Sequence, residues 1–177
     1  MKANEYQKLA RKTAIMDNAI APRRYHWFLG MVEEYFELLF SPVIEMSDEL
    51  GDILWYLANF AAEFDIKMSD LAPGEYGLFD METDILDLNS SPHRGREHHL
   101  NLLGRSIGEI AQYMKRSDWD TYKPVLHHSL VQILTDMLLH IVWISLGVVR
   151  TVSEIMQTNI EKLSNNHPRS RHIGKTD

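Results

Sequence analysis

The stretch from Glu33 to Asp52, EEYFELLFSPVIEMSDELGD, decides the fold of this chain and carries its most distinctive chemistry. Glu34 and Glu37 are three residues apart, and Glu49 and Asp52 have the same spacing. Residues i and i+3 share one face of an α-helix, so each pair predicts a ledge of two carboxylates. The stretch therefore predicts two acidic helix faces close together in the sequence.

Ser41-Pro42 separates the two pairs and predicts a helix boundary. Serine is a favoured N-cap and proline is tolerated in the first helical turn, so one helix is expected over 23–40 and the next over 42–64. Joined so tightly, two antiparallel helices bring their ledges face to face, where four carboxylates repel unless a cation lies between them. Hard oxygen ligands without Cys or His favour Mg²⁺, with Mn²⁺ as an alternative. Acidic pairs are also common on solvated helix faces, so spacing alone leaves both interpretations open.

Composition limits the remaining possibilities. The chain has 177 residues, 45% of them hydrophobic, which predicts one ordinary domain over 1–168 followed by a flexible tail over 169–177. The net charge of −7 argues against a nucleic-acid partner, and the lack of cysteine excludes disulfides and thiolate zinc sites. The polar N-terminus does not resemble a signal peptide, so we expect a cytoplasmic protein.

The rest of the chain reads as helix, and the predicted fold class is all-α. One 20-residue run, Leu130 to Val149, is long enough to cross a membrane but contains Gln132, Asp136 and His140. A helix buried inside a bundle is the better interpretation, and no membrane partner is expected. Helices are expected over 3–17, 23–40, 42–64, 68–72, 95–116, 124–147 and 152–164, the last one opened by a capping box from Thr151 to Glu154.

Residues 73–150 form either a degenerate second helical repeat or an insertion. With a shift of 84 positions, Leu50-Gly-Asp52-Ile-Leu54 aligns with Leu134-Thr-Asp136-Met-Leu138. A shift of 75 for the preceding helix aligns Glu34 with Glu109, so this second copy keeps only Glu109 and Asp136 of the acidic set. Because an unpaired buried carboxylate is unfavourable, structural pairing is the expected role of Asp136. A true repeat would let one chain build a four-helix core from its own halves.

The acidic pattern, ExxE, a short spacer and ExxD running into ELGDILWYLA, resembles the signature of the MazG-like all-α nucleoside triphosphate pyrophosphohydrolases, a superfamily that includes the dimeric dUTPases. The opening NEYQKLARKTA (Asn4 to Ala14) is similar to the family's first helix, and SEIMQTNIEKLSNNHPR (Ser153 to Arg169) is similar to its last. The spacer between Glu37 and Glu49, with 11 residues, is slightly short for the family. The shortest members also lack the segment 73–150.

The resemblance implies a Mg²⁺-dependent enzyme that hydrolyses a nucleoside triphosphate to the monophosphate and pyrophosphate. It implies Glu33 as the base that activates water. Spacing alone places Asn59 on the side of Asp52, where it could reach a base or sugar or merely bond a neighbouring helix. The implied metal ligands are Glu34, Glu37, Glu49 and Asp52, and the implied phosphate contacts are Asn159, Lys162 and Arg169.

The remaining expectations concern an alternative function, the histidines and the oligomeric state. The alternative to an enzyme is a non-catalytic helical binding or regulatory protein that keeps a relic acidic site. The adjacent histidines 98–99 and 127–128 point to different helix faces and are predicted to be surface residues. A homodimer is expected from a second apolar face on the long helix, which carries Leu139, Val142, Trp143 and Leu146. The sequence leaves the nucleotide base open.

Overall fold

The computed structural model describes residues 1–14, 23–71, 92–117 and 123–166, and these ranges hold helices and no strand. The fold is all-α, as predicted. The proposed phosphate contact Arg169, the expected loop over 73–91 and the tail over 169–177 lie outside the described residues. The helices are α1 (Ala3–Thr13), α2 (Arg23–Phe40), α3 (Met46–Ala62), the 3₁₀ helix η1 (Met68–Leu71), α4 (Pro92–Ser117), α5 (Lys123–Gly147) and α6 (Val152–Asn166).

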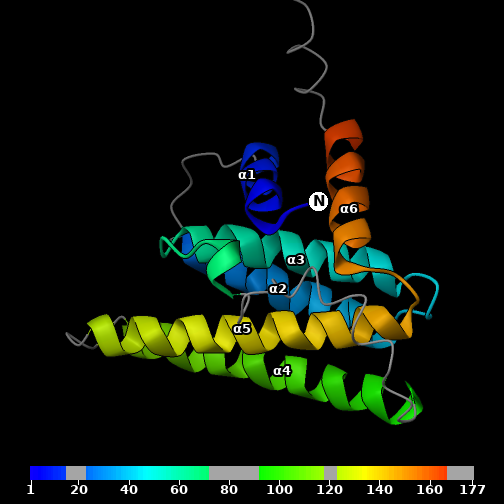
Figure 1. Ribbon diagram of the computed structural model, residues 1–177. Helices are drawn as coiled ribbons and strands as arrows, with labels where there is room; N and C mark the ends of the chain where they lie inside the picture. The colour runs from blue at the N-terminus through cyan, green and yellow to red at the C-terminus, as the bar shows by residue number, and fades with distance from the viewer. Residues whose placement is uncertain (15–22, 72–91, 118–122, 167–177) are drawn as a thin grey trace, which may run out of the picture.

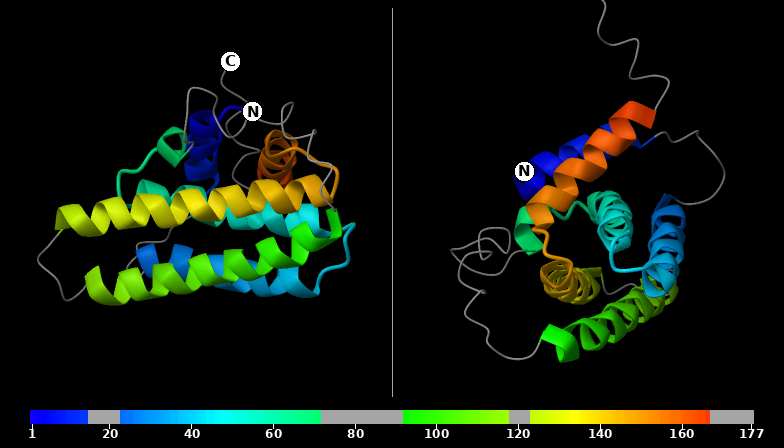
Figure 2. Two further views of the ribbon diagram at one scale, coloured as in Figure 1. Left: turned by 60° about the horizontal axis from the view of Figure 1, so that its bottom comes forward. Right: turned by 90° about the vertical axis from the view of Figure 1, so that its right-hand side faces the viewer.

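Two helix pairs form the core. Helices α2 and α3 pack along each other, as do α4 and α5, and contacts of α2 with α4 and of α3 with α5 join the pairs. The four helices run side by side in Figure 1, and the end-on view in Figure 2 shows them at the corners of one bundle. The four-helix core expected from a second helical pair is therefore built within one chain.

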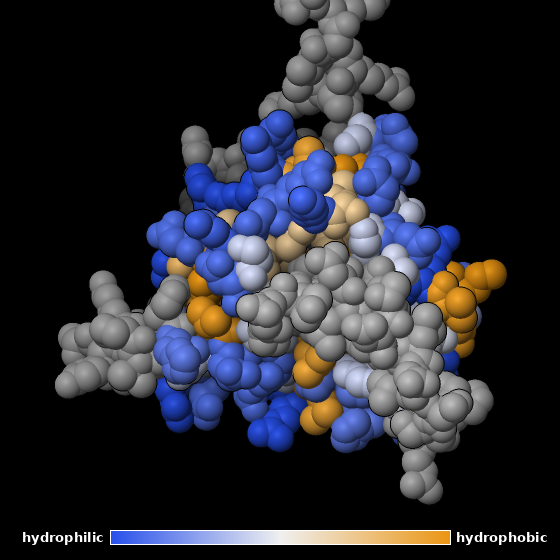
Figure 3. All heavy atoms as spheres, in the orientation of Figure 1, coloured by the Kyte–Doolittle hydropathy of each residue, from blue (hydrophilic) through white to orange (hydrophobic). Residues whose placement is uncertain are grey.

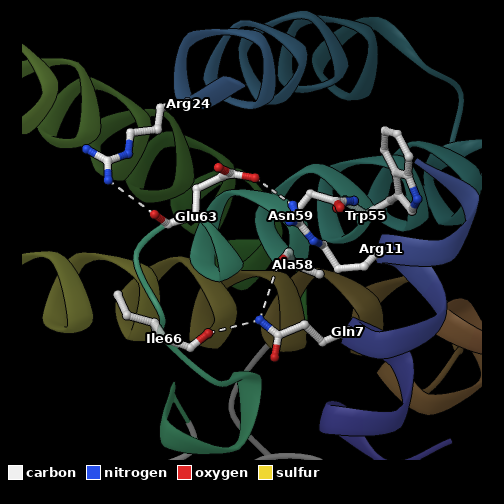
Figure 4. Close-up of polar contacts among 8 residues, drawn as sticks. All are labelled: Gln7, Arg11, Arg24, Trp55, Ala58, Asn59, Glu63 and Ile66. Carbon is white, nitrogen blue, oxygen red and sulfur yellow. Dashed lines mark hydrogen bonds and ion pairs between the residues drawn. The ribbon is translucent and has the colours of Figure 1, made fainter. Parts of the chain in front are cut away.

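The remaining helices, α1 and α6, pack against α3 and against each other on the side away from α4 (Figure 1). Side-chain bonds fix α1 across the C-terminal half of α3, as Figure 4 shows. Gln7 Nε2 donates to the carbonyl oxygens of Ala58 at 3.2 Å and Ile66 at 2.9 Å, and Arg11 pairs with Glu63 at 2.6 Å. These bonds attach the N-terminal helix to the last turn of α3 and the connection that follows it.

Helix α2 has the predicted bounds, but α3 begins four residues later than predicted. Ser41 does not cap α3; its hydroxyl donates to the carbonyl oxygen of Glu37 at 2.9 Å, at the end of α2. A turn follows, in which the amide of Glu45 donates to the carbonyl oxygen of Pro42 at 2.9 Å. A serine hydroxyl can bond backbone groups at the start or at the end of a helix. The sequence therefore predicted a helix boundary at Ser41 but not which of the two helices Ser41 would bond.

Helix α5 is the one described helix that is long and apolar enough to cross a bilayer, with a mean hydropathy of 1.7 over residues 128–147. A core helix passes the same test, and α5 packs along α4 and touches α3, η1 and α6. Asp136 is half-buried rather than buried, and its Oδ1 accepts a bond from Gln132 Nε2 at 2.9 Å. Asp136 therefore has a hydrogen-bond partner, as predicted, but it is not the buried carboxylate that was expected.

Candidate metal centre

Three carboxylates converge where α2 faces the first turns of α3. Glu34 comes from α2, and Glu49 and Asp52 come from α3. One oxygen of each lies within 4.8 Å of the others, and all three side chains are half-buried. The short connection between the antiparallel helices produces this convergence. A residue a given distance before the connection faces a residue about the same distance after it. The two acidic helix faces therefore meet as predicted.

The crowding of negative charge changes how these groups titrate. Burial, followed by the charges of Asp52, Glu37 and Glu49, raises the pKa of Glu34 from 4.5 to about 8. Burial and the neighbouring carboxylates also raise the pKa of Glu49, against smaller opposing effects of Ser41 and Lys162. Close carboxylates in a partly desolvated site cannot all ionise without compensation, so the site favours either a proton or a bound cation.

Asp52 is held from α6 on both of its oxygens. Lys162 Nζ lies 2.5 Å from Oδ2, and Asn159 Nδ2 donates to Oδ1 at 2.7 Å. The structure thus places both predicted α6 residues at the carboxylate cluster, where they bond a protein carboxylate. Because the two donors come from one helix, the position of α6 determines the orientation of Asp52.

Tyr6 is a site residue that the sequence reasoning missed. Its buried hydroxyl donates to Asn159 Oδ1 at 3.1 Å and lies 3.3 Å from the carbonyl oxygen of Gly51. This bond fixes the Asn159 amide so that Nδ2 faces Asp52. A tyrosine on the apolar face of the first predicted helix was the available signal, since a buried phenol needs a polar partner.

Three predicted residues behave differently from expectation. Glu37 is exposed and does not belong to the group whose oxygens converge, so three of the four predicted ligands meet. Glu33 is also exposed, although its charge contributes to the raised pKa of Glu34. Asn59 is fully buried and donates to the carbonyl oxygen of Trp55 in its own helix at 2.9 Å (Figure 4). Helical spacing predicted a shared face for these residues but did not determine their burial.

The donor set suits a hard divalent cation. Carboxylate oxygens are the ligands that Mg²⁺ and Mn²⁺ prefer. When fully ionised, the three carboxylates and the Lys162 ammonium leave two uncompensated negative charges, which one divalent ion would neutralise. Glu34, Glu49 and Asp52 are the residues that could hold it.

Comparison with models of known families, with characterised proteins and with solved structures finds no match for this chain.

Proposed function

We propose that the chain is a Mg²⁺-dependent nucleoside triphosphate pyrophosphohydrolase, with Mn²⁺ as an alternative ion. The observation that carries the proposal is the convergence of Glu34, Glu49 and Asp52 beside the Lys162 ammonium. Carboxylates that can bind a cation, next to an ammonium that is paired with Asp52 but partly exposed, suit a polyanionic substrate such as a triphosphate. The MazG-like resemblance of the same stretch supports this class of substrate.

Bound at the carboxylates, the ion would neutralise the phosphate charge and orient the α-phosphate for in-line attack. Water attacks the α-phosphorus, its oxygen forms the new P–O bond, and the bond to the bridging oxygen breaks so that pyrophosphate leaves. Glu33 is exposed and unbonded to the cluster, so it is available to accept the proton of the attacking water. Glu37, exposed one turn further along α2, would contact the ion or its waters at the rim.

Lys162 and Asn159 are the residues proposed to bind the phosphate groups. Lys162 is only partly covered, with 35% of its side chain exposed, so it can turn from Asp52 towards a phosphate. An ammonium on a flexible stem suits this exchange because it binds phosphate as a point charge without a fixed orientation. Arg169 is proposed for the leaving pyrophosphate on the resemblance alone. Asn59 would reach a base or sugar only if the substrate opens the helix packing around it.

The test is pyrophosphate release from a panel of natural and modified nucleoside triphosphates, with Mg²⁺ present. We expect turnover by the wild-type protein and a loss of at least a hundredfold in Glu49→Gln, because the charge but not the shape of a ligand is removed. Glu45→Gln is the matched control, since this exposed glutamate at the start of α3 makes no capping bond. Robust activity in Glu49→Gln would contradict the proposal.

The alternative function is a binding or regulatory protein that has lost catalysis. One observation favours it: Lys162 and Asn159 both bond Asp52, so the cluster is partly satisfied by its own chain. Such a protein would bind the metal or a nucleotide and release no pyrophosphate from any member of the panel. A nucleotide that raises the melting temperature without being hydrolysed would therefore select this alternative.

A further inference from the structure

A second set of metal-ligand side chains lies between α4 and α5, in the helix pair that lacks the acidic cluster. His99 Nδ1 on α4 is 3.2 Å from His140 Nδ1 on α5. Both side chains are half-buried, unlike His98 and His128, which are exposed as predicted. The ring of His98 lies edge-on to that of His99, with centroids 5.3 Å apart, but the nitrogen-to-nitrogen contact of His99 is with His140, 41 residues away.

A stacking contact holds the His99 imidazole in place. The His99 ring stacks on the Trp143 ring with centroids 5.2 Å apart and planes 1° from parallel. His140 and Trp143 are three residues apart on α5, so they share a face of that helix. An imidazole fixed by stacking keeps its ring nitrogen aimed at one point, which is the condition for a preorganised ligand.

The separation of the two nitrogens fits two ligands of one ion. Zinc–nitrogen bonds of about 2.0–2.1 Å at a tetrahedral angle place two ligand atoms about 3.3 Å apart. The observed 3.2 Å also fits a bond in which one Nδ1–H donates to the other ring, so distance alone allows both arrangements.

The protonation state of the pair is the one that metal binding requires. Burial, followed by the nearby His140 and His98, lowers the pKa of His99 to about 4. Burial also lowers the pKa of His140, while the charge of Asp136 opposes this. Both rings are therefore neutral near pH 7, and neutral imidazole is the form that ligates. Asp136, one turn before His140 on α5, supplies negative charge beside the pair.

We propose that His99 and His140 form a second metal site, which takes an imidazole-preferring divalent ion such as Zn²⁺ and joins α4 to α5. Water completes the coordination on the exposed side. The site differs from the carboxylate cluster in the ion it selects, since nitrogen ligands favour Zn²⁺ and oxygen ligands favour Mg²⁺. It does not depend on the proposed hydrolase activity.

The test is thermal unfolding of metal-stripped Glu49→Gln protein against Zn²⁺, in excess Mg²⁺. This background weakens the carboxylate cluster as a competing zinc site. We expect Zn²⁺ to raise the melting temperature, and we expect His99→Gln and His140→Gln each to weaken zinc binding at least tenfold. Glutamine keeps hydrogen-bonding capacity and bulk without an imidazole. His128→Gln, which removes an exposed histidine of α5, should leave the zinc effect unchanged.

Two results would overturn the proposal: no thermal shift with Zn²⁺, or a shift in the histidine variants as large as that of the Glu49→Gln parent protein. A second measurement leaves the pair intact in case a variant fails to fold. In proton NMR spectra of the Glu49→Gln protein, substoichiometric Zn²⁺ should shift the imidazole signals of two histidines and spare the others. Uniform broadening of all histidine signals would show non-specific surface binding and would also overturn the proposal.

Discussion

Glu34 is the residue of the carboxylate cluster on which burial and repulsion between negative charges act most strongly. It is half-buried, it faces Asp52 and Glu49 across the helix pair, and its own helix supplies Glu33 and Glu37 beside it. The same residue type three positions later, at Glu37, is exposed. Burial and position, rather than residue type, therefore make Glu34 the group that responds most strongly to protons and cations.

The first prediction is a pH dependence of stability in the metal-free protein. The pKa of Glu34 is raised to about 8 in the folded state, so the folded protein binds this proton more tightly than the unfolded chain does. Its contribution to stability is full below pH 4.5 and is lost as the pH rises through about 8. Urea unfolding between pH 5 and 9 should show this loss, and Glu34→Gln should flatten it, because glutamine stays neutral. An unchanged slope in Glu34→Gln would contradict the assignment.

At the scale of elements, α6 matters most, because it carries both donors to Asp52. Its start is fixed by a capping box: the Thr151 amide donates to Glu154 Oε2 at 2.9 Å, and the Glu154 amide donates to Thr151 Oγ1 at 3.1 Å. These bonds satisfy two amides that the helix leaves unpaired.

The second prediction concerns this cap. Thr151→Ala should destabilise the protein by about 0.5–2 kcal/mol, measured by urea unfolding. Thr158→Ala is the matched control, because Thr158 is exposed within the same helix and alanine is the better helix former there. Equal effects of the two substitutions would show that the cap does not stabilise α6.

The third prediction concerns the contact between α2 and α3, on which the cluster depends. A Cβ atom placed on Gly30 would lie 2.1 Å from the Tyr56 ring, so the helices approach closely because this residue has no side chain. Gly30→Ala should destabilise the protein by about 1–3 kcal/mol through overpacking. Gly108→Ala, on α4, meets nothing within 4 Å and should stabilise by up to about 1 kcal/mol. If Gly30→Ala stabilises the protein as Gly108→Ala does, α2 and α3 are further apart at Gly30 than the structure places them.

The helices were largely predictable from the sequence, because apolar periodicity and capping residues are local signals. Helix α2 and the capping box of α6 were predicted correctly, whereas the start of α3 depended on which helix end Ser41 would bond. The contacts between distant residues were not predictable: Tyr6 and Asn159, behind the carboxylate cluster, are 153 residues apart, and His99 and His140, between α4 and α5, are 41 apart. Such pairings are set by how the helices pack, which no local pattern records.

At the scale of the whole molecule, the apolar surface lies elsewhere than expected. On α5, Val142 is buried and Leu139, Trp143 and Leu146 are half-covered, so the face that suggested a homodimer is mostly occupied within the chain. Figure 3 shows a hydrophobic group at the edge of the molecule where the connection from α2 to α3 lies. The exposed large apolar residues of α2 and this connection are Leu29, Phe36, Leu39, Phe40, Val43 and Ile44.

The fourth prediction is that the chain forms a homodimer through these six residues, which we call the apolar stripe. Phe40 and Ile44 are 85% and 86% exposed, and large apolar side chains that gather in solvent in this way mark an interface. Light scattering during size exclusion should give twice the chain mass of 20.6 kDa. The double substitution Phe40→Glu and Ile44→Glu should give the single mass, whereas Val149→Glu, an exposed valine outside the stripe, should not. A wild-type mass of 20.6 kDa at micromolar concentration would refute the dimer.

The central claim is that Glu34, Glu49 and Asp52 hold a divalent cation, and thermal unfolding of the metal-free protein in increasing Mg²⁺ tests it most directly. Binding to the folded state alone raises stability by about 2.7 kcal/mol at a hundredfold excess over the dissociation constant, so the melting temperature should rise steadily through millimolar Mg²⁺. Glu49→Gln should lose most of this rise and Glu45→Gln should keep it. A melting temperature that does not change with Mg²⁺ or Mn²⁺, or one that rises equally in Glu49→Gln, would contradict the claim.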